Sequence, residues 1–424
     1  MNRRDFVGNL LRCGGVAAVG LTFGCAHQPV TIVGAAPAPV TLPPSSNPPP
    51  AKVLNGIDVL VREDFARFKN LCLGLITNHT GHDRGRHATI DLLKNAPGVK
   101  LTALFSPEHG IRGEYDSRID DSVDRRTGLP VYSLYGKRRA PLPEQLRGLD
   151  ALVFDIQDIG CRFYTYPSTM GLCLEAAGKA KLKFFVLDRV NPINGVALEG
   201  PLHTGKSSFV AFHSVPLRHG LTVGELARMY NVEKNYGADL TVIPVEGWRR
   251  SMWFDETGLP WTNPSPNMRS VAGTILYPGL GLHETPLSVG RGTDKPFEVV
   301  GAPYIDDVRL AYELERAELP GVRFVPIRFT PTYSTFKDRP CAGVACVITD
   351  RDKLNAVDIG LTIALTVQRL FPKDYALPKL NTLLQHPATL EAVRAGRSLA
   401  EIKQAWAGEL DEFRKRREPA LLYS

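Results

Sequence analysis

The sequence predicts an α/β protein with a parallel-sheet domain followed by a second, smaller α/β auxiliary domain. From about residue 53, apolar runs of strand length alternate with segments whose apolar residues recur at helical spacing. Four of these apolar runs end abruptly in acidic, amide, histidine or arginine residues. Beyond about residue 250, a long proline-rich loop and glycine-rich segments precede two further strand-like runs, which we interpret as the second domain.

The first domain is expected to have a Rossmann-like sheet with helices on both faces, because strands and helices alternate along the chain. The first strand-like run, at residues 71–76, is followed by a helical segment at 88–94. Ser168 and Thr169 are expected to cap a later helix. No Gly-x-Gly-x-x-Gly follows the first strand, so nothing indicates a dinucleotide. The other expected elements are strands at 101–105, 151–154, 184–187 and 240–245 and helices at 143–146, 170–180 and 222–230.

The second domain is expected to combine two strands with two long helices and to contain no repeats. Its elements are expected at residues 322–329 and 343–349 for the strands and at 356–370 and 398–415 for the helices. The composition changes near residue 250. We therefore place the first domain at residues 53–250 and the second at 251–424.

Residues 1–25 are typical of an export signal. Arg3 and Arg4 precede a weak apolar stretch that is too short to span a bilayer as a stable anchor. Cys25 occupies the position at which a lipoprotein is cleaved and acylated; in the alternative interpretation the signal is simply removed. Residues 26–52 are proline-rich and nearly uncharged, as in an extended linker. We expect an exported protein, periplasmic or on the outer surface, that contacts a membrane only through a lipid on Cys25.

The composition is that of a folded globular protein, with 43% hydrophobic and 8% aromatic residues. The formal net charge is +7, and without residues 1–25, which hold three arginines and one aspartate, it is +5 (7 − 3 + 1), which is too diffuse to indicate a nucleic-acid partner. An odd number of cysteines follows Cys25, and two of them lie in apolar segments, so a disulfide framework is not expected. A pair between Cys341 and Cys346 is the one alternative.

The strongest local signal for chemistry is the segment 106–110, in which Glu108 and His109 directly follow an apolar run. A glutamate just past a buried strand can be partly desolvated, which raises the pKa of its carboxyl group toward neutrality, as a general acid requires. In the alternative interpretation Glu108 is structural and caps a helix or pairs with Arg112.

Polar residues follow the other expected strands as well, and the carboxyl ends of parallel strands meet at one edge of a sheet. We therefore expect one carboxylate-rich crevice. Its candidate residues are Asn78 and His79, then Asp155, Gln157, Asp158, Arg162, Tyr164 and Tyr166, and then Asp188 and Asn191. Carboxylates and amides suit sugar hydroxyls, and aromatic rings suit the apolar face of a sugar. The alternative is a set of strand-end turns with core tyrosines and structural Asp–Arg pairs.

Two later segments add candidates. Glu199, between an apolar pair and Gly200-Pro201, is a candidate second acid, although a lone glutamate in a loop is more often structural. Arg218 and His219 precede a helix and could bind an anion there, or they belong to a capped helix with surface charge.

The sequence lacks the motifs of metal-dependent hydrolases and serine hydrolases. His79, His82 and His87 lie close together, but there is no His-Glu-x-x-His and no paired cysteine–histidine spacing, so no metal site is predicted. The absence of Gly-x-Ser-x-Gly argues against a serine hydrolase.

Together these segments resemble the NamZ family of exo-β-N-acetylmuramidases, formerly known only as a domain of unknown function. The resemblance runs from about residue 54 to the C-terminus and depends on many short motifs in order. The matching segments are residues 74–81, 105–110, 154–166, 188–195, 198–201, 218–226, 264–268, 277–279, 288–297 and 301–303.

The resemblance implies a Rossmann-like catalytic domain, a smaller auxiliary domain and a crevice between them. It implies release of N-acetylmuramic acid from the non-reducing end of peptidoglycan fragments without a cofactor, with Glu108 as the principal catalytic acid. The family pattern has a glutamate before Thr-Asn and Ser-x-Gly-Arg-Gly-Thr, and gap-free alignment places His283 there. Either Glu284 substitutes after a backbone shift, or the position has lost its role and the sugar specificity is altered.

The expected function is glycoside hydrolysis in cell-wall turnover, in which two carboxylates flank the bond that is cleaved. Glu108 is expected to protonate the leaving oxygen. The candidates for its partner carboxylate are Glu199, Asp155 and Asp158. Arg162 or Arg291 is expected to bind the lactyl carboxylate of muramic acid. The alternatives are a non-catalytic sugar-binding lipoprotein and a metal-dependent hydrolase of another wall bond.

Overall fold

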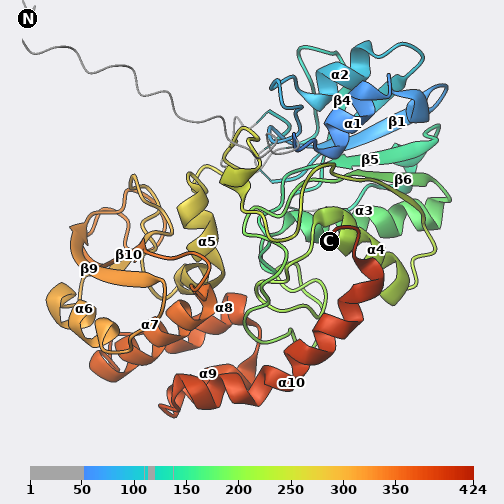
Figure 1. Cartoon of the computed structure of the whole chain (residues 1–424). Coiled ribbons are helices and arrows are strands. Elements are labelled where there is room, and N and C mark those ends of the chain that lie inside the picture. The colour runs from blue at the N-terminus through green and yellow to red at the C-terminus, as the bar shows by residue number, and fades with distance from the viewer. Residues whose placement is uncertain (1–51, 109, 113–119, 137) are drawn as a thin grey trace, which may run out of the picture. The chain divides into compact units, whose positions relative to one another are not determined.

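The computed structural model describes residues 52–108, 110–112, 120–136 and 138–424 (Figure 1). These residues form a mostly parallel seven-stranded sheet and a three-stranded antiparallel sheet, each packed with helices. The predicted fold class is therefore confirmed. The predicted export signal, nearly all of the predicted linker and His109 lie outside the described residues.

The larger sheet has the strand order β3-β4-β2-β1-β5-β6-β7, and only the β3–β4 pair is antiparallel. Its strands are β1 (Cys72–Thr77), β2 (Lys100–Ser106), β3 (Ser122–Val123), β4 (Pro130–Ser133), β5 (Ala151–Asp155), β6 (Lys183–Leu187) and β7 (Asp239–Ile243). The chain moves from β1 to β2 on one side and later returns to β5 on the other. The carboxyl ends of β1 and β5 therefore flank the switch point, where sheets of this kind usually bind ligands.

Helices cover both faces of this sheet. They are α1 (Gly56–Arg62) and α2 (Thr89–Asn95) on one face and α3 (Tyr166–Ala180) and α4 (Val223–Glu233) on the other. Successive strand residues point to opposite faces, so Leu152 and Phe154 enter the hydrophobic cluster of α3 and α4 whereas Val153 enters that of α1 and α2. Because α3 starts at Tyr166 with a proline in its first turn, Ser168 lies inside the helix and does not cap it.

The C-terminal part is built on the antiparallel sheet β8-β10-β9. Its elements are β8 (Val299–Ala302), β9 (Val322–Phe329), β10 (Cys341–Ile348), α5 (Val271–Leu280), α6 (Asp307–Glu315), α7 (Ala356–Leu370), α8 (Asn381–Leu384), α9 (Pro387–Arg394) and α10 (Leu399–Arg417). Helix α5 was not expected, because its sequence includes Pro278-Gly279. Gly279 permits the close crossing of α5 and α7, since a Cβ there would lie 1.7 Å from the carbonyl oxygen of Ala356.

The hydrophobic cluster on the α3–α4 face continues into the C-terminal part, where it includes Leu276, Val300 and Val344. Residues 51–424 accordingly form one compact unit. The division of this unit at residue 250 stays a prediction.

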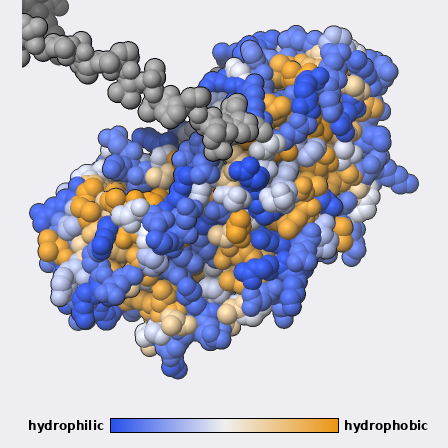
Figure 2. Space-filling view, in the orientation of Figure 1, coloured by the Kyte–Doolittle hydropathy of each residue, from blue (hydrophilic) through white to orange (hydrophobic). Residues whose placement is uncertain are grey.

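Figure 2 shows hydrophobic residues in separate patches among hydrophilic ones on the face in view. In the described part of the chain, no helix is both long and apolar enough to cross a membrane. The five described cysteines are free thiols.

Candidate active site

Glu108 lies at the carboxyl edge of the larger sheet, two residues after the end of β2, and is half-buried. The hydroxyl group of Thr165 donates to its Oε2 over 3.5 Å, and the hydroxyl group of Tyr135 donates to the same carboxylate. Burial and the Glu108 carboxylate raise the pKa of Tyr135 to about 12, so its hydroxyl remains a donor at neutral pH. Arg112, the alternative partner of Glu108, instead binds Asp124.

A pocket with a cavity volume of about 280 Å³ opens beside Glu108. Some lining residues belong to loops at the edge of the larger sheet and others to the C-terminal part. The pocket therefore lies between the larger sheet and the C-terminal part. The lining residues are Glu108, Tyr135, Phe163, Tyr164, Thr165 and Tyr166 from the former and Ser265, Asn267, Met268, Tyr277, Arg291, Phe297 and Tyr333 from the latter.

Aromatic rings form much of this lining. Tyr164 and Tyr166 meet edge to face with ring centroids 5.0 Å apart, and Tyr277 meets Phe297 in the same way at 4.7 Å. The hydroxyl group of Tyr166 donates to the carbonyl oxygen of Pro264 over 2.8 Å, which fixes the ring against the proline-rich loop. The inner wall is therefore largely aromatic, with apolar faces that suit a sugar ring.

Arg291 brings a positive charge to the pocket and is held by Glu284. Nη2 of Arg291 donates to Oε2 of Glu284 over 2.9 Å, and the hydroxyl group of Tyr277 donates to Oε1 over 3.2 Å. Burial raises the pKa of Glu284 and Arg291 opposes this shift, while the nearby Glu108 charge adds to it. The pocket thus brings two carboxylates and one guanidinium into electrostatic contact.

Two family models match almost the whole described chain. The model described as Exo-beta-N-acetylmuramidase NamZ, N-terminal, matches residues 73–272, and that for the C-terminal domain of NamZ matches residues 275–423. The chain is 42% identical over 400 residues to the peptidoglycan beta-N-acetylmuramidase NamZ of Bacillus subtilis, covering 93% of this chain and 96% of that protein. The chain belongs to the NamZ family. The predicted resemblance is therefore confirmed.

Solved structures of two DUF1343 family proteins from Bacteroides fragilis share the architecture of this NamZ family member. The first has a TM-score of 0.83 at 37% identity and covers 89% of this chain and 100% of its own. The second has a TM-score of 0.70 at 29% identity and covers 88% of this chain and 99% of its own.

In this NamZ family member, the switch point of the sheet is filled by protein side chains. Oδ1 of Asp155 accepts from Nε of Arg189 over 2.6 Å, and Oδ2 accepts from the hydroxyl group of Thr89 over 2.5 Å. Gln157 donates from Nε2 to the carbonyl oxygens of Asp158 and Val190. A cavity of only about 10 Å³ remains there. Asp155 and Gln157 are therefore structural, which corrects the expectation that they face a ligand.

Asp158 and His219 face each other in the interior, with Oδ2 and Nε2 3.7 Å apart. Burial raises the pKa of Asp158 to about 7 and lowers that of His219 to about 3. Nδ1 of His219 accepts the backbone N–H of Leu221, which places the ring proton on Nε2. Both side chains are buried and neither lines the pocket beside Glu108, contrary to the expectation that Asp158 and His219 face the crevice.

Glu199 and Arg218 form a buried ion pair with Oε1 and Nη1 2.5 Å apart. Oε2 of Glu199 also accepts the backbone N–H of Val357 in the first turn of α7. Arg162 is buried as well and donates to the carbonyl oxygens of Pro201, Val215 and Leu384. Glu199 and Arg162 thereby join loops of the first domain to C-terminal helices, and Arg218 neutralises Glu199. The structure thereby corrects their expected roles as second acid, anion site and lactyl ligand.

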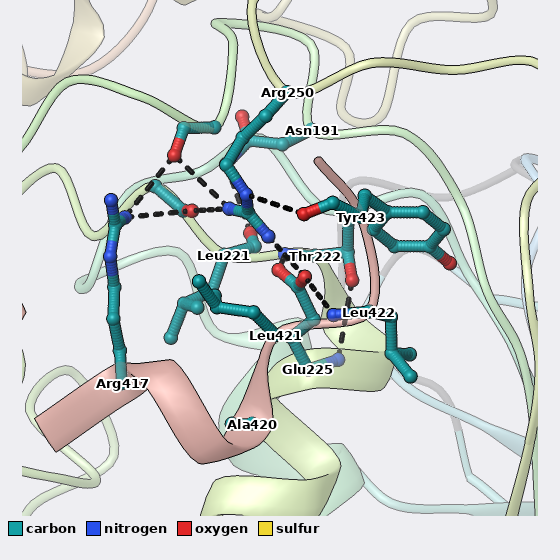
Figure 3. Close-up of polar contacts among 12 residues, drawn as sticks. Asn191, Leu221, Thr222, Glu225, Arg250, Arg417, Ala420, Leu421, Leu422 and Tyr423 are labelled. Atoms are coloured by element: carbon teal, nitrogen blue, oxygen red, sulfur yellow. Dashed lines mark hydrogen bonds and ion pairs between the residues drawn. The ribbon is translucent and has the colours of Figure 1, made fainter.

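The C-terminal segment, residues 418–424, satisfies carboxylates at the edge of the larger sheet. Asp188 accepts from the hydroxyl groups of Tyr423, over 2.5 Å, and Thr222, over 2.7 Å. Figure 3 shows Glu225 between Arg250 and the backbone of Leu422, to which it is hydrogen-bonded. Asp188 is thus structural and is not the predicted sugar ligand.

Asn191 is also structural, because its Nδ2 donates to the carbonyl oxygen of Leu221. Asn78 accepts from the backbone and hydroxyl group of Thr80. Nε2 of His79 donates to the carbonyl oxygen of Asn263 over 2.7 Å. Asn78 and His79 therefore support the loops behind the pocket and are not part of its lining, contrary to expectation.

The structure shows what replaces the family glutamate that gap-free alignment places at His283. His283 is fully buried, donates from Nε2 to the carbonyl oxygen of Gly360 over 2.9 Å and accepts from Tyr375 at Nδ1. Glu284 points instead to Arg291 and Tyr277, which line the pocket. The carboxylate is therefore supplied one position later in the chain than gap-free alignment places it.

Five predicted residues contribute to the pocket or its support: the lining includes Glu108, Tyr164, Tyr166 and Arg291, and Glu284 contacts Arg291. Sequence reasoning assigned no role to Tyr135, Asn267, Tyr277, Phe297 and Tyr333, although the segments 264–268, 277–279 and 288–297 contributed to the resemblance. Within the described ranges, no group of three or more histidine, cysteine, aspartate or glutamate side chains is arranged to hold a metal ion.

Proposed function

We propose that this protein is a glycosidase that releases N-acetylmuramic acid from the non-reducing end of peptidoglycan fragments. Membership of the NamZ family supports this reaction. The observation that carries the proposal for this chain is the position of Glu108, which is held by two hydroxyl groups at an aromatic pocket that also contains Arg291.

Glu108 acts as the general acid that protonates the oxygen of the departing sugar. It is half-buried and lines the pocket, so its carboxyl group can contact a bound sugar. The hydroxyl groups of Tyr135 and Thr165 orient the carboxyl group toward the pocket.

Arg291 binds the lactyl carboxylate that distinguishes muramic acid from N-acetylglucosamine. Its Nη2 is committed to Glu284, whereas its buried Nε has no hydrogen-bond partner among the described residues. A substrate carboxylate would supply that partner through a charge-assisted hydrogen bond.

Glu284 is the second carboxylate of the reaction, in place of Asp155, Asp158 and Glu199. It contacts two lining residues and lies close enough to Glu108 for their charges to interact. It stabilises the positive charge that develops on the sugar ring and holds Arg291 in place.

The experiment is hydrolysis of a chromogenic N-acetylmuramide and of a muramic acid–glucosamine disaccharide. We expect the folded Glu108→Gln variant to lose most activity on the disaccharide, because the amide is too weak an acid to protonate the leaving oxygen. The loss on the chromogenic substrate should be smaller, because its leaving group departs with little protonation. Glu144→Gln, at an exposed position outside the pocket, is the matched control. Wild-type binding of the disaccharide without turnover would instead indicate a receptor for wall sugars.

We further infer that the protein acts outside the cytoplasm, with the folded domain held on a proline-rich linker. The paired Arg3 and Arg4, the short apolar stretch and Cys25 support this location. Fractionation of cells that express wild type, Arg3→Lys/Arg4→Lys and Cys25→Ser tests export and lipid attachment separately. Retention of the wild-type chain in the cytoplasm would contradict the inference.

A further inference from the structure

One aromatic residue of the pocket differs from the others in its exposure. Tyr164, Tyr277 and Phe297 are at most 9% exposed and belong to the inner wall, whereas Tyr333 is 45% exposed. Tyr333 also lines the pocket, so it belongs both to the lining and to the exposed surface. An aromatic face at this position can still be covered by a ligand.

Tyr333 belongs to the loop between β9 and β10, and this loop is fixed to the pocket by two hydrogen bonds. The hydroxyl group of Thr335 donates to the backbone carbonyl oxygen of Glu284 over 2.7 Å. The hydroxyl group of Thr332 donates to that of Gly292 over 2.8 Å. Gly292 has φ +80°, and a Cβ there would lie 2.7 Å from the backbone nitrogen of Tyr333, so glycine permits this approach. The loop is therefore positioned by the segment that carries Glu284 and Arg291.

Tyr333 lines the same pocket as Glu108, Tyr135 and Arg291. The ring therefore shares the pocket with the proposed acid and the proposed carboxylate ligand, and it is the most exposed of the aromatic lining residues compared above.

The size of the pocket indicates what lies beside Tyr333. A cavity of about 280 Å³ is slightly smaller than the lower bound of about 300 Å³ for typical ligand pockets. One amino sugar can occupy the enclosed part, and the rest of a saccharide must then leave through the mouth. The sugar on the reducing side of the cleaved bond would pass the exposed face of Tyr333.

We propose that Tyr333 is a specificity-determining residue whose ring stacks on the departing sugar, so that the auxiliary domain supplies the binding platform for the leaving group. This inference rests on the proposed glycosidase function and specifies how the enzyme recognises the reducing-side sugar. The relevant ligand is an uncharged pyranose with an apolar face.

The test compares two substrates that differ only beyond the cleaved bond. In β-N-acetylmuramyl fluoride the leaving group is one atom and cannot reach Tyr333, whereas in the muramic acid–glucosamine disaccharide it is a sugar. For Tyr333→Ala we expect kcat/KM for the disaccharide to fall about fivefold to tenfold, the scale of an aromatic contact, with the value for the fluoride unchanged. Tyr333→Phe should retain both activities, because the ring remains.

Tyr312→Ala is the matched control, since Tyr312 is an exposed tyrosine on α6 that does not line the pocket. Equal losses for both substrates in Tyr333→Ala, no loss for either, or a disaccharide defect in Tyr333→Phe as large as in Tyr333→Ala would each overturn the inference. Failure of the wild-type enzyme to hydrolyse either substrate would refute the proposed glycosidase function itself.

Discussion

The Glu199→Met substitution tests whether Glu199 stabilises the fold or takes part in catalysis. Glu199 and Arg218 are 3% and 1% exposed, and the substitution leaves the Arg218 guanidinium buried without its counter-ion. Breaking a buried pair by removal of one partner costs about 3–5 kcal/mol. The N–H of Val357 also loses its acceptor, so we expect the upper part of that range. For a folded unit of residues 51–424, each kcal/mol shifts Tm by about 1.3 °C, so Tm should fall by roughly 5–7 °C.

The assay combines thermal unfolding with disaccharide hydrolysis at a temperature where the variant remains folded. We expect Glu199→Met to have a lower Tm and a near-wild-type kcat. The double variant Glu199→Met/Arg218→Met should regain part of the lost stability, because no unpaired charge stays buried. A stable Glu199→Met protein with kcat reduced a hundredfold would refute this reasoning and indicate a catalytic role for Glu199.

Two further outcomes follow from the site and the interior. Arg291→Met should raise the Kd of N-acetylmuramic acid about 10- to 100-fold but leave that of N-acetylglucosamine unchanged in calorimetry, because only the former has a lactyl carboxylate; equal losses would contradict a carboxylate contact. Burial raises the pKa of Asp158 from 3.8 to about 7, so the folded state favours the protonated carboxyl group. Its contribution to the free energy of unfolding is therefore fully present below pH 3.8 and is lost as pH rises through 7. Relative to Asp158→Asn, the wild-type free energy of unfolding should therefore fall by about 2–4 kcal/mol between pH 4 and pH 8 in denaturant titrations, and a constant difference would show that Asp158 does not titrate in this range.

The central strands were predictable because they are buried on both faces and therefore read as continuous apolar runs, as in residues 151–155. β3 and β4 were missed because they are short and partly exposed, so their sequences lack such a run. α5 was missed for a different reason. Its Pro278 and Gly279 have the composition of a turn, and only the close contact with α7 explains the glycine.

The candidate site was harder to predict than the fold, because a polar residue after a strand can face either substrate or another side chain. Glu108 and Asp155 occupy equivalent places in the sequence pattern. Asp155 is neutralised by Arg189, which follows another strand, and local sequence gives no sign of this long-range pairing. Tyr135 and Tyr333 approach the pocket from loops almost 200 residues apart in the printed sequence, so only the folded chain reveals that they are neighbours.

The hydrogen bonds of the C-terminal segment have a consequence for biosynthesis. Asp188 receives a donor from Tyr423, 235 residues later, and Glu225 receives one from Leu422, 197 residues later. While the C-terminus is still inside the ribosome, these carboxylates lack those donors, and the first domain cannot attain its final packing. A stop codon only a few positions early would therefore release a nearly full-length chain whose interior carboxylates lack one donor each, and cellular proteases would remove it more readily than the complete protein.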